Sequence, residues 1–122
     1  MAERRVRGIR GATTVGQNTP EQILQETRRL LLALQEANGF SLDDVVTAFF
    51  SMTPDLDAAY PAAAARELGW ERVPLFGGRE AGVVGVPGRC VRVLVQVYTE
   101  RDAAAIHHVY LGEAARLRPD LS

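Results

Sequence analysis

The sequence predicts an α+β domain with a mixed β-sheet, covered on one face by one long helix and a shorter one. Strand-type segments outnumber helical ones, and only one segment has the length and apolar spacing of a long amphipathic helix. The chain has 122 residues, of which 47% are hydrophobic and 24% charged. That size and mix fit one globular domain spanning residues 1–122.

The long helix is the clearest element of the pattern. Thr19 and Gln22 resemble a capping box, Pro20 suits the first helical position, and Asn38-Gly39 is a typical stop. Apolar residues recur at helical spacing between these ends. Alanines follow Pro61 in the shorter helix, predicted over 61–68 and ended by Gly69.

The strands are predicted from short runs of β-branched and aromatic residues. Valines alternate with Arg92, Leu94 and Gln96 in one of them, which indicates a strand with two different faces. The glycine-rich stretch 77–88 is predicted to be a mobile connection, and 102–106 a single helical turn. Residues 112–122 show no period and are predicted to form a mobile C-terminal tail. The remaining predicted strands are 5–15, 45–52, 73–76 and 107–111.

Charge and cysteine content exclude several classes of protein. All fourteen basic residues are arginine, and fifteen acidic residues bring the net charge to −1. This balance argues against nucleic-acid or membrane-surface binding. The lack of lysine excludes a Schiff base and a P-loop. The single cysteine, Cys90, and the absence of a signal-type or membrane-spanning apolar run predict a cytoplasmic location.

Common catalytic motifs are also missing. His107 and His108, the only histidines, are adjacent in a predicted strand and point to opposite faces, so they cannot form a metal pair. We therefore expect surface or packing roles for them and no metal site. The sequence contains no G-x-S-x-G nucleophile motif, and its glycines match no dinucleotide fingerprint.

The remaining candidates are arginines with a few polar partners. Arg10 and Arg92 lie inside strand-like segments, where a charged side chain must face solvent or a partner. A guanidinium can hold a carboxylate through two parallel hydrogen bonds. Arg66, Glu80 and Tyr110 complete the set. Taken one by one, each of the five also has an ordinary interpretation as a solvated or half-buried side chain.

Taken together, the motifs resemble one enzyme family. The segment RGIRGATTV at 7–15 looks like the opening of the trimeric α/β chorismate mutases. Further matches follow in family order and cover nearly the whole chain: TPDL at 53–56, YPA at 60–62, ARELGW at 65–70, CVRV at 90–93, HVYL at 108–111 and LRPDLS at 117–122.

The resemblance implies a fold, an activity and a set of site residues. The protein would be a homotrimer, a pseudo α/β barrel with sites between subunits, that isomerises chorismate to prephenate without a cofactor. Arg92 would lie beside the breaking ether oxygen, and Glu80 would accept a hydrogen bond from the ring hydroxyl. Arg10 and Tyr110 would hold the enolpyruvyl carboxylate. The implied binding residues also include Tyr60, Ala62, Arg66, Leu75, Phe76 and, on the tail, Arg118.

Departures from the family and two rival functions remain. Family members can carry threonine and cysteine where this chain has Phe76 and Gly77, and a lysine where it has Ala63. We expect these changes to alter affinity more than chemistry. An imine or enamine deaminase of similar trimeric fold would also anchor a carboxylate with arginine. A non-catalytic trimer that binds an aromatic-pathway metabolite is the second alternative.

Overall fold

The computed structural model describes residues 3–85 and 87–116 of the chain. Five strands form one mixed sheet in the order β3-β2-β4-β1-β5. The central strand β4 runs antiparallel to β1 and β2, whereas β3 and β5 run parallel to their neighbours. The strands are β1 (Arg5–Thr14), β2 (Val45–Met52), β3 (Leu75–Arg79), β4 (Cys90–Thr99) and β5 (Val109–Tyr110).

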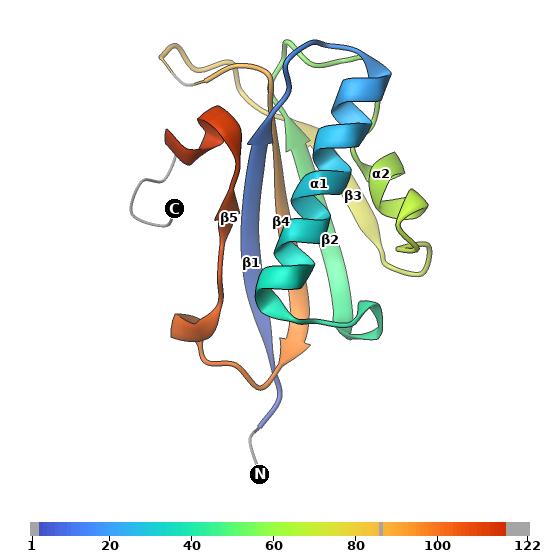
Figure 1. Cartoon of the computed structure of the whole chain (residues 1–122), viewed down its shortest axis with the longest axis vertical. Coiled ribbons are helices and arrows are strands. Elements are labelled where there is room, and N and C mark those ends of the chain that lie inside the picture. Colours follow the sequence, from blue (N-terminus) through green and yellow to red (C-terminus); the bar gives the residue numbers. More distant parts are fainter. Residues whose placement is uncertain (1–2, 86, 117–122) are drawn as a thin grey trace.

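Two α-helices lie on the same side of this sheet. The long helix α1 (Pro20–Asn38) crosses β1, β4 and β2, and the short helix α2 (Ala62–Glu67) lies beside it, over the β2–β3 side (Figure 1). Three short 3-10 helices occupy Leu42–Asp44, Ala103–Ala105 and Gly112–Arg116. The predicted α+β architecture is confirmed. Within the described residues, no helix is long and apolar enough to cross a membrane.

Helix α1 begins and ends where the sequence predicts. The side chain of Thr19 accepts a hydrogen bond from the backbone N–H of Gln22, and Pro20 is the first helical residue. Gly39 adopts the left-handed conformation (φ 65°) and donates its N–H to Gln35 O. One face of the helix is buried against the sheet, at Ile23, Thr27, Leu30, Leu31, Leu34 and Asn38.

The core lies between the helices and the sheet. Alternate residues of β4, from Val91 to Val97, point to the helices, together with Ile9 of β1 and Phe50 of β2. Trp70, which follows α2, packs edge-on against Phe40 with ring centroids 6.2 Å apart. These contacts bury one face of the sheet.

Gly11 of β1 leaves room for two leucine side chains of α1. A Cβ placed there would lie 2.9 Å from Leu34 Cδ1 and 3.1 Å from Leu30 Cδ1. We expect Gly11→Ala to lower the free energy of unfolding by about 1–3 kcal/mol, because the fully buried side chains of Leu30 and Leu34 must move. Gly16→Ala is the control, since its Cβ would meet only the end of the Gln22 side chain. Urea unfolding at one protein concentration compares them, and equal destabilisation by both would contradict this packing argument.

The opposite side of the sheet, here called the open face, carries no α-helix in the described part of the chain. Its exposed apolar side chains come from paired positions of neighbouring strands. Val6 of β1 pairs with Tyr98 of β4, and Leu94 of β4 with Phe49 of β2. The Phe76 side chain continues this line on β3, with its ring centroid 6.2 Å from that of Phe49. An apolar stripe of this length is typical of a surface that meets another chain.

Three elements differ from their predicted bounds. The strand predicted at 73–76 is β3, which begins at Leu75 and continues to Arg79, because Gly77 and Gly78 pair with Phe50 and Ser51. The first part of the glycine-rich stretch 77–88 is therefore strand, not connection. The strand predicted at 107–111 shortens to Val109–Tyr110. The tail predicted from residue 112 begins as a 3-10 helix that buries Ala114 against Ala12 and Cys90.

Candidate active site

Strand register brings three of the predicted site residues onto the open face. Arg92 on β4 pairs with Ser51 on β2 and with Ala12 on β1, and Ala12 pairs in turn with Tyr110 on β5. Paired residues point to the same side of a sheet and stand about 4.8 Å apart from strand to strand. Arg10 is two residues before Ala12 and therefore shares its face.

Glu80 joins Arg92 and Ser51 from the end of β3. Its backbone N–H donates to Met52 O at 2.8 Å, and its carboxylate accepts a hydrogen bond from Ser51 Oγ at 2.6 Å. The same oxygen, Oε2, lies 3.2 Å from Arg92 Nε. The side chain of Glu80 is only 18% exposed, against 42% for Arg92. The acid is thus fixed beside a cation that stays accessible.

The contact between Arg92 and Glu80 is an ion pair without a directed hydrogen bond. Although the two atoms are close, the Nε–H of Arg92 does not aim at the carboxylate, and this buried Nε has no acceptor within the described residues. A buried donor without a partner is uncommon and is often found at functional sites. Arg92 is therefore oriented by charge while keeping hydrogen-bonding capacity.

Arg10 is held through its backbone by β5. The N–H of Arg10 donates to His108 Nδ1 at 2.9 Å. The guanidinium makes no hydrogen bond or ion pair with the rest of the described chain. Arg10, Arg92 and Tyr110 line one hollow of about 350 Å³, together with Ser51, Phe49 and Leu94. Two cations and one phenol thus share a small depression whose other walls are apolar apart from Ser51.

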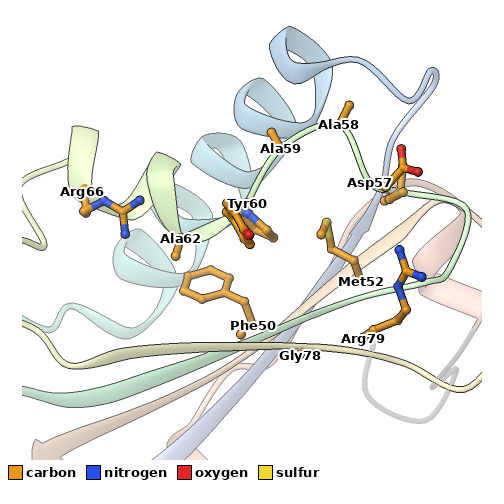
Figure 2. Close-up of a pocket in the computed structure, with 13 residues that line it drawn as sticks. Phe50, Met52, Asp57, Ala58, Ala59, Tyr60, Ala62, Arg66, Gly78 and Arg79 are labelled. Atoms are coloured by element: carbon orange, nitrogen blue, oxygen red, sulfur yellow. The ribbon is translucent and has the colours of Figure 1, made fainter.

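A second hollow, of about 700 Å³, contains another part of the predicted set. Figure 2 shows the side chains of Phe50 and Met52 rising from the sheet toward Tyr60, with Arg66 of α2 at one end and Arg79 of β3 at the other. Tyr60, Ala62 and Arg66 all line this hollow. Tyr60 is 79% exposed. It lies between α2 and the sheet, on the helix side.

The two hollows lie on opposite faces of the sheet. Phe50 and Met52 point toward the helices, whereas Phe49 and Ser51, which alternate with them, point to the open face. Within one chain, Tyr60 and Arg66 therefore do not meet Arg10 and Arg92. Leu75 and Phe76 are not among the lining residues of either hollow. Arg118 lies outside the described residues.

Sequence reasoning missed two residues that contact the predicted set. Ser51 donates to Glu80, and His108, for which a surface or packing role was expected, accepts a hydrogen bond from the backbone N–H of Arg10. The alternation of β2 indicates that Ser51 shares a face with Phe49, but a serine in a strand carries no signal by itself. His108 required the β1–β5 register, which depends on tertiary structure.

Neither the cysteine nor a metal cluster offers other chemistry in the described part of the chain. Burial raises the pKa of the Cys90 thiol to about 11, so it is not a thiolate at neutral pH. No group of three or more histidine, cysteine or acidic side chains there could hold a metal ion. The arrangement that remains is cationic, small and edged by one carboxylate, which is typical of a site for an organic anion with a hydroxyl group.

Comparisons with known proteins identify the family. Residues 6–121 match the family model described as chorismate mutase type I. A chorismate mutase of Thermus thermophilus is 51% identical over 117 residues, covering 95% of this chain and 96% of that protein. A chorismate mutase of Bacillus subtilis (strain 168) is 48% identical over 118 residues, covering 96% of this chain and 93% of that protein. The protein belongs to the type I chorismate mutase family.

A solved structure agrees with this assignment. A chorismate mutase from Clostridium thermocellum superposes with a TM-score of 0.88 at 44% identity, covering 90% of this chain and 98% of that one. The fold predicted from the resemblance is therefore shown for a single chain.

Proposed function

We propose that this protein isomerises chorismate to prephenate by a concerted rearrangement. The observation that carries the proposal is the hollow of the open face, where Arg10, Arg92 and Tyr110 meet and Glu80 is fixed beside Arg92. Full-length similarity to named chorismate mutases supports it. The comparisons do not favour the deaminase or the metabolite-binding trimer.

The reaction suits a site made of arginines. Chorismate is a dianion, and its rearrangement needs no nucleophile, base or redox centre. An enzyme can hold the two reacting ends in a compact geometry and donate to the ether oxygen as negative charge develops there. An acceleration of ~10⁶-fold corresponds to ~8 kcal/mol. One preorganised cationic donor can supply ~3–4 kcal/mol of this, and positioning can supply the rest.

Each residue of the open-face hollow has a role in this proposal. Arg92 donates to the ether oxygen, Arg10 and Tyr110 bind the enolpyruvyl carboxylate, and Glu80 accepts from the ring hydroxyl. The position of Glu80 supports its role, because Ser51 and Arg92 hold its carboxylate in place. The Arg92–Glu80 contact also keeps the cation near the ether oxygen of the substrate, which accepts, and the carboxylate near the ring hydroxyl, which donates.

The second hollow completes the site only if the protein assembles. Tyr60, Ala62 and Arg66 lie on the helix side of the sheet, so they would reach a substrate bound at the open face of a neighbouring chain. The apolar stripe on the open face supports such a contact: Phe49 is 44% exposed and Tyr98 49%. We infer a homotrimer with sites between subunits, with Leu75, Phe76 and the tail residue Arg118 as further binding residues at the subunit boundary.

A direct assay tests the function. Purified protein should consume chorismate and form prephenate, at a rate that a chelator does not change, because the proposed chemistry uses no metal. The substrate's absorbance falls as the conjugation of its ring diene is lost, and chromatography identifies the product. Binding of chorismate without turnover would favour the metabolite-binding alternative, and turnover of an imine or enamine instead would favour the deaminase.

Location and tail order remain predictions. The single buried cysteine is consistent with the cytoplasm, where thiols stay reduced. The segment beyond Arg116 would be more ordered with substrate than without it, because Arg118 would then meet a substrate carboxylate.

A further inference from the structure

The connection between β3 and β4 is held at both ends by one short segment of the chain. This connection starts at Glu80, the residue after β3, and ends at Arg89, the residue before β4. At its first end, Glu80 N–H donates to Met52 O at 2.8 Å, and the Glu80 carboxylate accepts from Ser51. Residues 51 and 52 therefore fix the position of the proposed catalytic acid.

The other end is held by Thr53 and Asp55. Both oxygens of the Asp55 carboxylate accept from the N–H of Arg89, at 3.0 and 2.9 Å. The hydroxyl of Thr53 donates to Asp55 and accepts from the N–H of Cys90 at 2.9 Å, and the Thr53 N–H donates to Cys90 O at 3.0 Å. Thr53 is 5% exposed. Its one hydroxyl proton and one lone pair are both used, so it links Asp55 to the start of β4.

The backbone around Arg89 is shaped to suit this carboxylate. Arg89 has φ 47°, and it is the one non-glycine residue with positive φ in the described chain. Such a conformation is strained for a residue with a side chain and needs compensating contacts. A Cβ at Gly88 would lie 2.5 Å from Asp55 Oδ2, so a larger residue there would displace the carboxylate. Arg89 in turn donates its Nε–H to Val15 O at 3.1 Å, which fixes the end of β1.

The consequence concerns the distance between Glu80 and Arg92. Arg92 follows Arg89 by three residues and Cys90 by two, so a change in the start of β4 moves its side chain relative to Glu80. The Nε–Oε2 distance of 3.2 Å depends on both ends of the connection keeping their places. Errors of about 1 Å in an active site can lower rates ~10²-fold. Asp55 itself lines neither hollow that contains predicted site residues.

We propose that Asp55 is a positioning residue for the rearrangement, acting through Thr53 and the backbone of Arg89 and Cys90 to hold Arg92 against Glu80. The proposal rests on the proposed function of the open-face hollow. Asp55 does not touch the substrate. It sets the geometry of two groups that do.

Kinetics of Asp55→Ala provide the first test. We expect kcat to fall ~10-fold with KM changing less than ~3-fold, since the bound substrate is kept but the reacting geometry is lost. Thr53→Val, which keeps the shape and removes the hydroxyl, should act in the same direction. Asp102→Asn is the control, because Asp102 makes no capping hydrogen bond with its side chain. Should Asp55→Ala fail to fold, Asp55→Asn and Thr53→Val carry the test.

A double-mutant cycle separates positioning from a general loss of structure. If Asp55 acts through the Glu80–Arg92 pair, then Asp55→Ala should lower kcat by less than ~2-fold when Glu80→Ala is already present. Amide hydrogen exchange at Arg89 and Cys90 should accelerate in both Asp55 variants. Faster exchange with unchanged kcat, or additive losses in the cycle, would show that Asp55 only stabilises the turn and would overturn the proposal. If wild-type protein did not turn over chorismate, the proposed function would fail first, and the exchange result would still stand.

The charge of Asp55 predicts how stability depends on pH. The hydrogen bond from Thr53, followed by that from the N–H of Arg89, lowers the pKa of Asp55 below its usual value. Because the folded state has the lower pKa, the ionised group stabilises the fold above the unfolded pKa, and this contribution is lost as pH falls through the folded pKa. We expect Asp55→Asn to be less stable than wild type above about pH 5, and the difference to shrink as the pH falls below the usual carboxyl pKa toward the lower folded-state pKa. A difference that did not shrink in acid would contradict the role of the ionised carboxylate.

Discussion

Replacing Arg92 with citrulline, its neutral isostere, should lower kcat by ~10²–10³-fold, the range for losing one preorganised donor. The ether oxygen gains charge only as its bond to the ring breaks, so a cation aimed there binds the transition state better than the substrate. The loss should therefore appear in kcat more than in KM. Semisynthetic protein and steady-state kinetics give the measurement. Citrulline retains the Nε–H donor and lacks the positive charge. The comparison therefore measures the contribution of the charge alone.

Two companion variants sharpen this result. Arg92→Lys should recover part of the loss if its ammonium group reaches the ether oxygen. Lysine restores the positive charge but lacks the planar arrangement of donors in the guanidinium group. Glu80→Gln keeps an oxygen that can accept from both Ser51 and the ring hydroxyl, so it should be milder than Glu80→Ala. Citrulline protein with kcat within a few-fold of wild type would reduce Arg92 to a substrate anchor and contradict the electrostatic mechanism.

Local signals in the sequence were sufficient for much of the fold. Helix α1 has its cap and its first proline at one end and its terminal glycine at the other, and β2 ends at Met52, just before Thr53-Pro54. These features depend on a few neighbouring residues, so they can be predicted without tertiary structure. The alternation of β4 likewise predicts its two faces.

Tertiary pairing determined what local signals could not. Gly77 and Gly78 have low strand propensity, but pairing with Phe50 and Ser51 extends β3 through them and places Glu80 at its end. Ala114 is buried because Ala12 and Cys90 offer a small apolar surface to the segment after β5. A single alanine in a polar segment carries no periodic signal, so this contact could not be predicted.

The candidate site shows the same division. The arginines could be singled out because charge inside a strand demands an explanation, and the family motifs supplied one. The residues that hold the site in place could not be singled out in this way. Ser51 precedes a turn and Asp55 lies within it, and their importance comes from hydrogen bonds to residues about thirty positions later in the chain. Motif reasoning also left open which site residues come from the same subunit.

The distribution of the residues over two faces changes how subunit sharing should be tested. A sequence-based choice would mix Arg10→Ala with Arg92→Ala protein. Both residues line the same hollow of one chain, so this pair cannot complement if that hollow acts as a unit. The informative pair takes one residue from each hollow, Arg92 from the open face and Arg66 from the helix side.

Mixed trimers of Arg92→Ala and Arg66→Glu protein should regain activity that neither variant has alone. If each site joins the open face of one chain to the helix-side hollow of its neighbour, random exchange at equal amounts leaves about one quarter of the sites with both parts intact. Arg66→Glu replaces a cation by an anion facing a dianionic substrate, so its defect should be greatest below KM, where activity is measured. Subunit exchange is verified by native mass spectrometry before the assay.

Arg10→Ala mixed with Arg92→Ala is the matched control and should regain nothing, because every open face then lacks one of its two arginines. Equal recovery in both mixtures would contradict the single open-face hollow. If neither mixture regained activity after verified exchange, each complete site would lie within one chain. The argument for assembly from the two hollows on opposite faces would then be wrong.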